Sequence, residues 1–237
     1  MRGPEWIAVD DPGFRWGWGV FETLQVRGGR AIFHQMHLEN IAEAAQALGL
    51  PMPDPGPWSK APREEGIWRW FLTPKTQTQL WEEGLPEVPS GMSMELSPLV
   101  LSRASWEARY KTLSYLTRQQ ARQESGSDEA LLLNEKGQIA SACMANVFWV
   151  REGILHTPDL ECGCRDGVLR RWVLESWAEE CRVGAYEVKE LEGAEEIFLT
   201  NSRLGVMPVH SFEGRNLEVG RVVHELRARY AGMLERL

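Results

Sequence analysis

The chain contains little cysteine and little lysine, and it lacks a long hydrophobic run. Its four cysteines are too few and too unevenly spread for a disulfide scaffold, so we expect reduced structural thiols. No apolar run reaches the roughly 18 residues that a membrane-spanning helix needs. These absences argue against a small disulfide-stapled domain and against an integral membrane protein.

Positive charge is also scarce. Acidic residues outnumber basic ones by 34 to 26, which gives a formal net charge of −8. A surface of that sign repels a phosphate backbone or an anionic lipid, so neither nucleic acid nor a membrane is expected as a partner. The opening stretch MRGPEWIAVDD lacks the basic-then-apolar layout of a signal peptide. We therefore expect a cytoplasmic protein.

Patterns of metal ligands are weak. Cys162 and Cys164 are one residue apart, and no second pair completes a zinc site. His34 and His37 could share one face of a helix, but no acidic partner is evident near them in the sequence. We expect no metal site.

What is present is enough apolar sequence for a real core. With 237 residues, 43% of them hydrophobic, the chain can form one large domain or two modest ones. GVFETLQVRGGRAIF predicts a hairpin, and helically spaced apolar residues after it predict a helix that ends at Gly49. A second helix and a strand are expected through EEGIWRWFL. Proline and glycine then cluster in Glu82 to Gly91, the expected connection between lobes of residues 1–84 and 91–237.

The second half of the chain is rich in predicted strands. MSMELSPLVLS alternates as a strand, and SDEALLLNEKGQIASACMANVFWVREGILHTP reads as a meander with turns at NEKG and REG. DGVLRRWVLESWAEEC predicts an amphipathic helix, and AEEIFLTNSRLGVMPV predicts a strand, a turn and a strand. This order favours an α/β or α+β architecture in two lobes over a helical bundle or a sandwich.

One of the five lysines differs from the others in its surroundings. Lys111 follows Tyr110 and opens a segment in which Leu113, Leu116 and Ala121 have roughly helical spacing. At the edge of an apolar site the ammonium form is disfavoured, which lowers the pKa and frees the amine for Schiff-base chemistry. The alternative is a lysine with its stem on the core and its head in water, and the position alone favours that alternative.

Four stretches, in this order, resemble the class IV aminotransferases, the pyridoxal-phosphate fold type that includes branched-chain and D-amino-acid aminotransferases and 4-amino-4-deoxychorismate lyase. GWGVFETLQV is similar to a G-D-G-V-F-E-T-L strand of the family, YKTLSYL to its lysine segment, and the meander to the strands that carry a cofactor-contacting acid and N-V-F-W. HTPDL, DGVLR and TNSRLGVMPV are similar to the family's T-P-x-L, G-(I/V)-x-R and T-N-S-x-x-G-V-x-P-V motifs. Together these stretches span Gly17 to Val209.

The resemblance implies a two-lobed class IV aminotransferase-like fold, with an N-terminal α/β lobe and a C-terminal strand-rich pseudobarrel lobe. The C-terminal lobe is expected to carry the lysine and the cofactor cleft. In this fold Lys111 would form a Schiff base with pyridoxal 5'-phosphate and move protons on a small, amino-acid-like substrate. A homodimer is also implied.

The phosphate of the cofactor would bind at the start of a helix. Gly167, Val168 and Leu169 open that helix, and its free N–H groups can hold a phosphate. The resemblance adds Thr200 and Asn201 as contacts to the same anion. Taken alone, DGVLR could be only a helix start and TNS only a turn.

Three family positions hold different residues. Trp18 stands in place of an aspartate, and Asn40 stands in place of an arginine that pairs with the phosphate. Asn40 donates only neutral hydrogen bonds, which weakens cofactor binding unless Arg27, Arg30 or His37 reaches the same oxygens.

Ser141 occupies the third position, where the family has a glutamate that hydrogen-bonds the pyridine nitrogen. A hydroxyl cannot stabilise a pyridinium as a carboxylate does, so we expect a shallower electron sink. That favours elimination by a 4-amino-4-deoxychorismate lyase, which yields 4-aminobenzoate and pyruvate for folate synthesis. The alternative activity is transamination of branched-chain or D-amino acids. A third possibility is a cofactor-impaired relative with a binding or assembly role, because Asn40 and Ser141 replace cofactor contacts. Arg15, Arg109 or Arg170 could meet substrate carboxylates.

Overall fold

The chain divides into two units, each built around its own sheet, in a computed structural model that describes residues 7–236. The first unit contains the described residues up to Pro86 together with Tyr110–Tyr115, and the second contains Glu87–Arg109 and Leu116–Arg236. The Lys111 segment therefore belongs by its contacts to the first unit, whereas the sequence analysis assigned it to the C-terminal lobe. Residues 1–6 and 237, which the predicted lobes include, lie outside the described residues.

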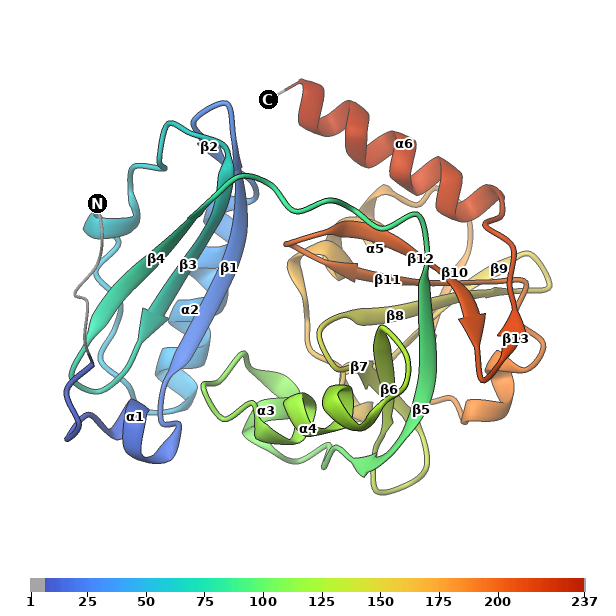
Figure 1. Ribbon diagram of the computed structural model, residues 1–237, viewed down its shortest axis with the longest axis horizontal. Coiled ribbons are helices and arrows are strands. Elements are labelled where there is room, and N and C mark those ends of the chain that lie inside the picture. The colour runs from blue at the N-terminus through green and yellow to red at the C-terminus, as the bar shows by residue number, and fades with distance from the viewer. Residues whose placement is uncertain (1–6, 237) are drawn as a thin grey trace. The chain divides into compact units, whose positions relative to one another are not determined.

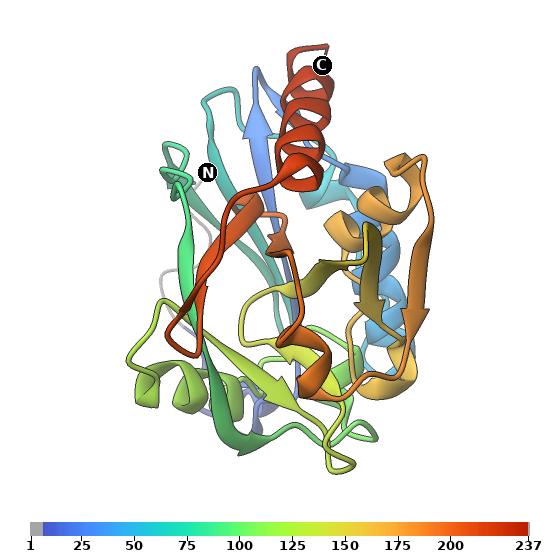
Figure 2. The ribbon, with the colours of Figure 1, turned by 90° about the vertical axis from the view of Figure 1, so that its right-hand side faces the viewer.

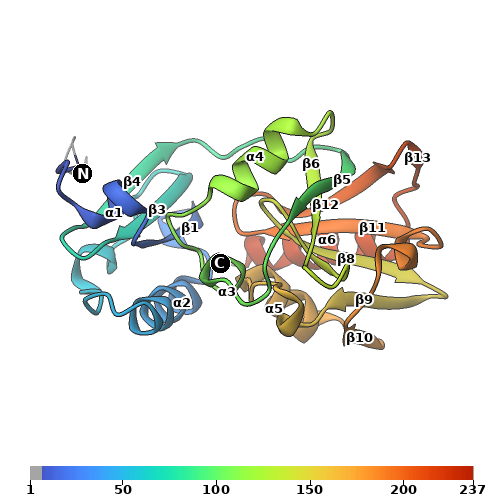
Figure 3. The ribbon, with the colours of Figure 1, turned by 90° about the horizontal axis from the view of Figure 1, so that it is seen from below.

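The first unit is a four-stranded antiparallel sheet with one long helix on a face. The strands follow the order β2-β1-β3-β4. Their bounds are β1 (Val20–Arg27), β2 (Arg30–Ala31), β3 (Gly66–Leu72) and β4 (Gln77–Glu83). Helix α2 (His34–Ala47) lies along the sheet, as Figures 1 and 3 show, and a short helix α1 (Pro12–Trp16) precedes β1. The predicted hairpin and the helix after it are confirmed.

The second predicted helix is wrong. The chain between α2 and β3 forms a single 3-10 turn, Gly56–Trp58. The reason is local: the run PMPDPGP supplies prolines that lack an N–H donor and block helix propagation.

Tryptophan fills the core between α2 and the sheet. Trp58 stacks on Trp70 with 4.9 Å between ring centroids, and Trp68 meets Trp70 edge-on at 5.1 Å. All three rings are fully buried, and each such ring removes a large apolar area from water. Side chains alternate along β1, so Leu24 joins this core while Phe21 lies on the opposite face of the sheet. That opposite face is the one that the lysine segment uses.

The second unit is a mixed sheet of nine strands. The order is β10-β9-β8-β11-β12-β5-β6-β7, with β13 paired to β12. The bounds are β5 (Met92–Val100), β6 (Glu129–Leu133), β7 (Ile139–Ala142), β8 (Asn146–Arg151), β9 (Ile154–Pro158), β10 (Cys181–Gly184), β11 (Glu196–Asn201), β12 (Gly205–Phe212) and β13 (Arg215–Asn216). The sheet curls, as Figure 2 shows, and its inner face holds a core that includes Leu131, Val147, Trp149, Leu199 and Met207. The predicted meander and the strand–turn–strand unit are confirmed.

Two helices of the second unit are shorter than the sequence pattern predicted, and the other two were not predicted. They are α3 (Trp106–Arg109), α4 (Leu116–Glu124), α5 (Val168–Ser176) and α6 (Arg221–Glu235), with 3-10 turns at Leu160–Cys162 and Val188–Leu191. The helical spacing read from Lys111 onward is wrong, because the backbone around Lys111 pairs with β1 and the helix begins only at Leu116. Among the described residues, no helix has both the length and the apolar composition to span a bilayer.

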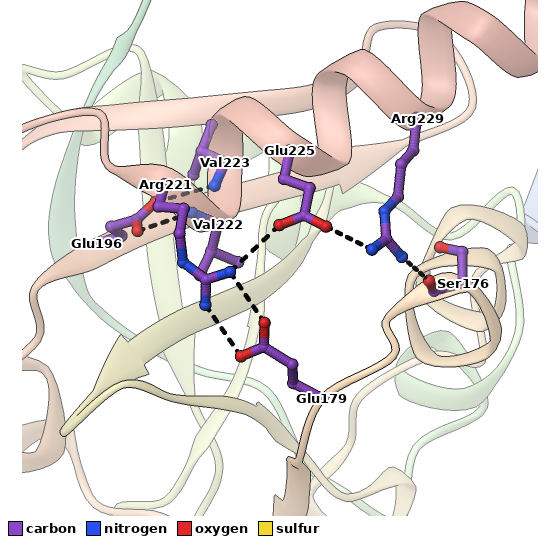
Figure 4. A network of polar contacts seen from close by, with 8 residues as sticks. All are labelled: Ser176, Glu179, Glu196, Arg221, Val222, Val223, Glu225 and Arg229. Carbon is purple, nitrogen blue, oxygen red and sulfur yellow. Dashed lines mark hydrogen bonds and ion pairs between the residues drawn. The ribbon is translucent and has the colours of Figure 1, made fainter.

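Helix α6 is fixed to the sheet by a buried carboxylate (Figure 4). Glu196, at the start of β11, accepts hydrogen bonds from the backbone N–H groups of Val222 at 3.0 Å and Val223 at 2.9 Å. A Cβ on Gly220 would lie 2.4 Å from the Glu196 carboxylate, so a larger residue at this N-cap position would displace that carboxylate. Glu196 thus does from a distant strand what an N-cap side chain does locally, and its charge complements the helix dipole.

We expect Glu196→Gln to lower the free energy of unfolding by about 1–3 kcal/mol. The amide would replace a charged acceptor by a neutral one and would turn one N–H group toward another donor. Urea denaturation measures the change, with the exposed Glu192→Gln as the matched control, expected within about 0.5 kcal/mol of the parent. Equal losses in the two variants would contradict this role of Glu196.

Candidate functional site

Lys111 lies in an extended segment that pairs with the beginning of β1. The Phe21 N–H donates to the Lys111 carbonyl at 2.9 Å, and the Leu113 N–H donates to the Gly19 carbonyl at 2.9 Å. Thr112 is the antiparallel bridge partner of Val20. This register sets Lys111 beside Phe21, on the face of the sheet opposite α2.

The amine of Lys111 rests on aromatic rings. Its Nζ is 4.4 Å from the ring centroid of Phe21 and 5.8 Å from that of Tyr115. Phe21 in turn stacks on Phe71 and meets Tyr115 edge-on, with centroids 6.0 and 5.6 Å apart. The nitrogen thus lies against aromatic carbon atoms, which cannot exchange protons with it. The head of this half-buried side chain, and not only its stem, therefore contacts apolar surface.

The start of α5 has a glycine at its N-cap position, and an asparagine packs beside it. Gly167 is the N-cap, and no side chain caps the helix there. A Cβ on Gly167 would lie 2.2 Å from Oδ1 of Asn146, so a larger residue does not fit. The Nδ2 of Asn146 donates to the Arg165 carbonyl at 2.8 Å and lies 3.1 Å from the Cys164 sulfur. Val168 and Leu169 follow, both buried, with their backbone N–H groups in the first turn.

A buried hydroxyl lies on the same face of the sheet. Thr200 is opposite Asn146 in the β8–β11 pairing, and opposed residues project to the same side. Thr200 is 1% exposed, and its Oγ1 has no hydrogen-bond partner among the described residues. Buried hydroxyls are seldom left without a partner, and a helix start with an available donor beside it is suited to an anion. These residues fit the phosphate of pyridoxal phosphate.

The hydrogen bonds of Asn201 hold a turn. Its Nδ2 donates to the Met144 carbonyl at 3.2 Å, and its Oδ1 accepts from the N–H groups of Arg203 at 3.0 Å and Leu204 at 2.8 Å. These contacts stabilise the connection between β11 and β12. The interpretation of TNS as a turn therefore describes Asn201, whereas Thr200 has the available donor.

Asn40 lies in α2, in the first unit, and is half-buried. Two of the side chains that could replace the missing arginine contact other groups of that unit. His37 Nδ1 is 2.7 Å from Oε2 of Glu22, and Arg27 Nε donates to Gln25 at 2.8 Å. His37 and Arg27 are thus in contact with side chains of β1.

The two histidines of HQMH contact different groups. His34 Nε2 is 2.6 Å from the carbonyl oxygen of Trp58, while His37 bonds Glu22. Over residues 7–236 there is no group of three or more potential metal ligands.

Ser141 is buried in β7 and is in contact with an arginine that the sequence analysis missed. Its Oγ is 2.7 Å from the Ala142 carbonyl oxygen and 3.0 Å from that of Ala145. The Nη1 of Arg118 donates to Ser141 Oγ at 3.3 Å. Arg118 is 3% exposed although it belongs to the polar helix α4, LTRQQARQE. The signal that was available is Ala121, one turn further on and also buried, which marks the inward face of α4.

The arginines considered for substrate carboxylates differ in their surroundings. Arg170 is buried, and its Nη2 donates to the Pro158 carbonyl at 3.0 Å. Arg109 is exposed and lies 3.9 Å from Glu161, and Arg15 lies over the exposed ring of Trp16. Arg170 therefore serves the fold, whereas Arg15 and Arg109 are exposed.

The predicted site residues fall in both units. Lys111 and Asn40 belong to the first unit. Ser141, the α5 start and the two residues at the end of β11 belong to the second. Within the second unit, the structure brings Gly167 and Thr200 together through Asn146.

The chain matches known proteins along most of its length. A family model described as Amino-transferase class IV matches residues 73–212. The aminodeoxychorismate lyase of Bacillus subtilis (strain 168) is 28% identical over 247 residues, which cover 89% of this chain and 83% of that protein.

Solved structures agree in fold. The 4-amino-4-deoxychorismate lyase from Pseudomonas aeruginosa has a TM-score of 0.86 at 24% identity and covers 97% of this chain and 96% of that chain. A branched-chain amino acid aminotransferase from T.th., solved with pyridoxamine 5'-phosphate, has a TM-score of 0.83 at 20% identity, covering 97% and 89%. These matches confirm the predicted mixed α/β fold with a strand-rich pseudobarrel.

We expect Thr200→Val in the cofactor-free protein to leave the free energy of unfolding unchanged or to raise it by up to about 1 kcal/mol, because a buried hydroxyl without a partner is removed. Thr157→Val is the matched control. The Thr157 hydroxyl is fully buried and donates to the Val147 carbonyl at 2.9 Å, so its loss should cost about 1 kcal/mol. Thermal or urea unfolding compares them. A loss at Thr200 as large as that at Thr157 would show that its hydroxyl serves the fold.

Proposed function

We propose that this chain, which belongs to the class IV aminotransferase family, is a pyridoxal-phosphate-dependent 4-amino-4-deoxychorismate lyase. The observation that carries the proposal is the match to an aminodeoxychorismate lyase over 89% of the chain. The reaction splits its substrate into 4-aminobenzoate and pyruvate and needs neither an oxidant nor a reductant.

Each unit carries residues suited to one part of the cofactor. Lys111 would hold it through Nζ. The N–H groups of Val168 and Leu169 and the hydroxyl of Thr200 would hold its phosphate, with the positive end of the α5 dipole adding to the attraction. Asn40 would contribute only neutral hydrogen bonds. When bound, pyridoxal phosphate withdraws electrons from the carbon that bears the substrate amino group, a chemistry that no side chain supplies.

Lys111 also serves as the general base and acid. Its Nζ removes the proton from the amino-bearing ring carbon of the substrate. The carbon–oxygen bond to the side group then breaks, and the electron pair leaves with the oxygen. Lys111 returns the proton to the departing group, which becomes pyruvate, while the ring becomes aromatic. The rings of Phe21 and Tyr115 keep Nζ in place for both transfers.

Ser141 favours elimination over amino transfer. A carboxylate at this position would stabilise a positive charge on the pyridine nitrogen, and a hydroxyl does so far less. Elimination needs the electron pair only until the leaving group departs, whereas amino transfer needs it to persist until a proton arrives at another carbon. Transamination of a branched-chain or D-amino acid is the second candidate, supported by the structural likeness to a branched-chain amino acid aminotransferase.

We expect the purified protein incubated with pyridoxal phosphate to gain a visible absorption band, and borohydride reduction to fix the cofactor on Lys111. Peptide mass mapping identifies the modified residue. Lys111→Ala should lose both signals, and Lys136→Ala, an exposed lysine in the NEKG turn, should keep them. Retention of no cofactor by the parent protein would leave only a binding or assembly role.

Product analysis then separates the activities. Incubation with 4-amino-4-deoxychorismate should release 4-aminobenzoate and pyruvate in equal amounts with no 2-oxo acid added. Formation of a new amino acid only when a 2-oxo acid is supplied would establish the aminotransferase instead.

We also expect Thr200→Val to weaken the binding of pyridoxal phosphate by about tenfold to a hundredfold, because one hydrogen bond to a charged phosphate oxygen is lost. Fluorescence titration measures the affinity. An unchanged affinity would remove Thr200 from the phosphate site while leaving the role of Lys111 intact.

A further inference from the structure

The buried guanidinium of Arg118 donates hydrogen bonds to the turn that joins β7 to β8. The Nη1 of Arg118 donates to the Ala142 carbonyl at 2.9 Å, to the Cys143 carbonyl at 3.2 Å and to Ser141 Oγ at 3.3 Å. Arginine is a permanent cation, and burying one requires a strong compensating reason. The Nη1 of Arg118 thus contacts three neutral oxygens, and one of them is the hydroxyl of Ser141.

The same turn leads to the phosphate-fitting residues. It begins at Ser141 and ends at Asn146, which opposes Thr200 and contacts the position of Gly167. Arg118 thus stands at one end of this stretch, and the anion-binding donors stand at the other.

Two other titratable groups, Glu129 and Cys143, lie at the turn. Glu129 accepts hydrogen bonds from the N–H groups of Ala130 and Met144, both at 3.1 Å. Burial raises the pKa of its carboxyl group, against those bonds and the attraction of Arg122. Burial, together with Glu129, raises the pKa of the Cys143 thiol to about 12, so this thiol stays neutral. The guanidinium of Arg118 brings a positive charge to within 3.3 Å of Ser141 Oγ.

We propose that Arg118, acting through Ser141, keeps the pyridine nitrogen of the bound cofactor unprotonated. The inference rests on the proposed function, in which Ser141 is the residue beside that nitrogen. A protonated nitrogen there would be a second buried cation next to the first, and like charges disfavour each other.

The hydrogen-bond directions agree with this. Ser141 Oγ accepts from Arg118, and its own hydrogen is free to turn from the Ala142 or Ala145 carbonyl to a nitrogen lone pair. A hydroxyl that already accepts from a cation is a stronger donor. An unprotonated ring withdraws electrons less strongly, so it disfavours amino transfer more than a fast elimination. Arg118 is therefore a positioning residue that sets the reaction type.

Nitrogen NMR of the protein loaded with pyridoxal phosphate labelled with ¹⁵N in the ring tests the inference without measuring turnover. The parent protein should show the ring nitrogen at a neutral-pyridine frequency at every pH at which it is folded. Arg118→Gln removes the charge but keeps amide donors for the turn, and it should raise the apparent pKa of the ring nitrogen by about 1–3 units.

Two variants serve as controls. Arg118→Lys retains the charge and should keep the nitrogen neutral. Arg122→Gln removes an exposed charge from the same helix and should behave as the parent. A pyridinium signal in the parent overturns the inference, and it does so even if Arg118→Gln fails to fold. Identical titrations of the parent and a folded Arg118→Gln also overturn it. A parent that retains no cofactor overturns both this inference and the proposed function, whereas a pyridinium in a loaded, active protein overturns this inference alone.

Discussion

Two backbone hydrogen bonds decide where the reactive amine lies. They join Phe21 to Lys111 and Leu113 to Gly19, so a segment from beyond residue 109 becomes an extension of the first sheet. Backbone pairing fixes the residue to a register, and alternation along β1 then presents the ring of Phe21 to the lysine. The lysine side chain has four rotatable bonds and would otherwise sample many positions. Here the backbone of Lys111 is fixed by strand pairing, and its Nζ lies against aromatic rings.

Backbone pairing positions Lys111 in the first unit, whereas close packing of Asn146 against Gly167 shapes the start of α5 in the second unit. Asn146 occupies the space that a side chain at position 167 would need, and no side chain caps the helix start. Thr200 reaches the same face from the neighbouring strand. Each of these residues has an ordinary role in a strand or a helix. Their combination arises because β8 and β11 pair in one register only, which a slip of one residue would abolish.

Local pattern was sufficient for much of this structure. Strands such as Asn146–Arg151 and Glu196–Asn201 alternate or run apolar between clear turn residues, and the short motifs around Lys111 and Gly167 identified the family. The sequence misled where chance spacing imitated a helix after Lys111. It was silent on Arg118, because an arginine in a polar helix looks exposed until the helix is docked. It was equally silent on the contact of His37 with Glu22, since the partner lies on a strand earlier in the chain. Motifs identify residues, whereas contacts across elements decide what those residues do.

The path of the chain through the two units has a consequence for its biogenesis. The polypeptide passes from one unit to the other three times, after residues 86, 109 and 115. A ribosome that has released only the first 86 residues has produced a sheet whose β1 edge beside Val20 is still open. That edge is sealed about thirty residues later, and by the same segment that delivers the amine. Scission at the proline-rich connection would therefore yield a fragment with an unprotected strand and no nucleophile. Closing the sheet edge and placing the amine are therefore one event.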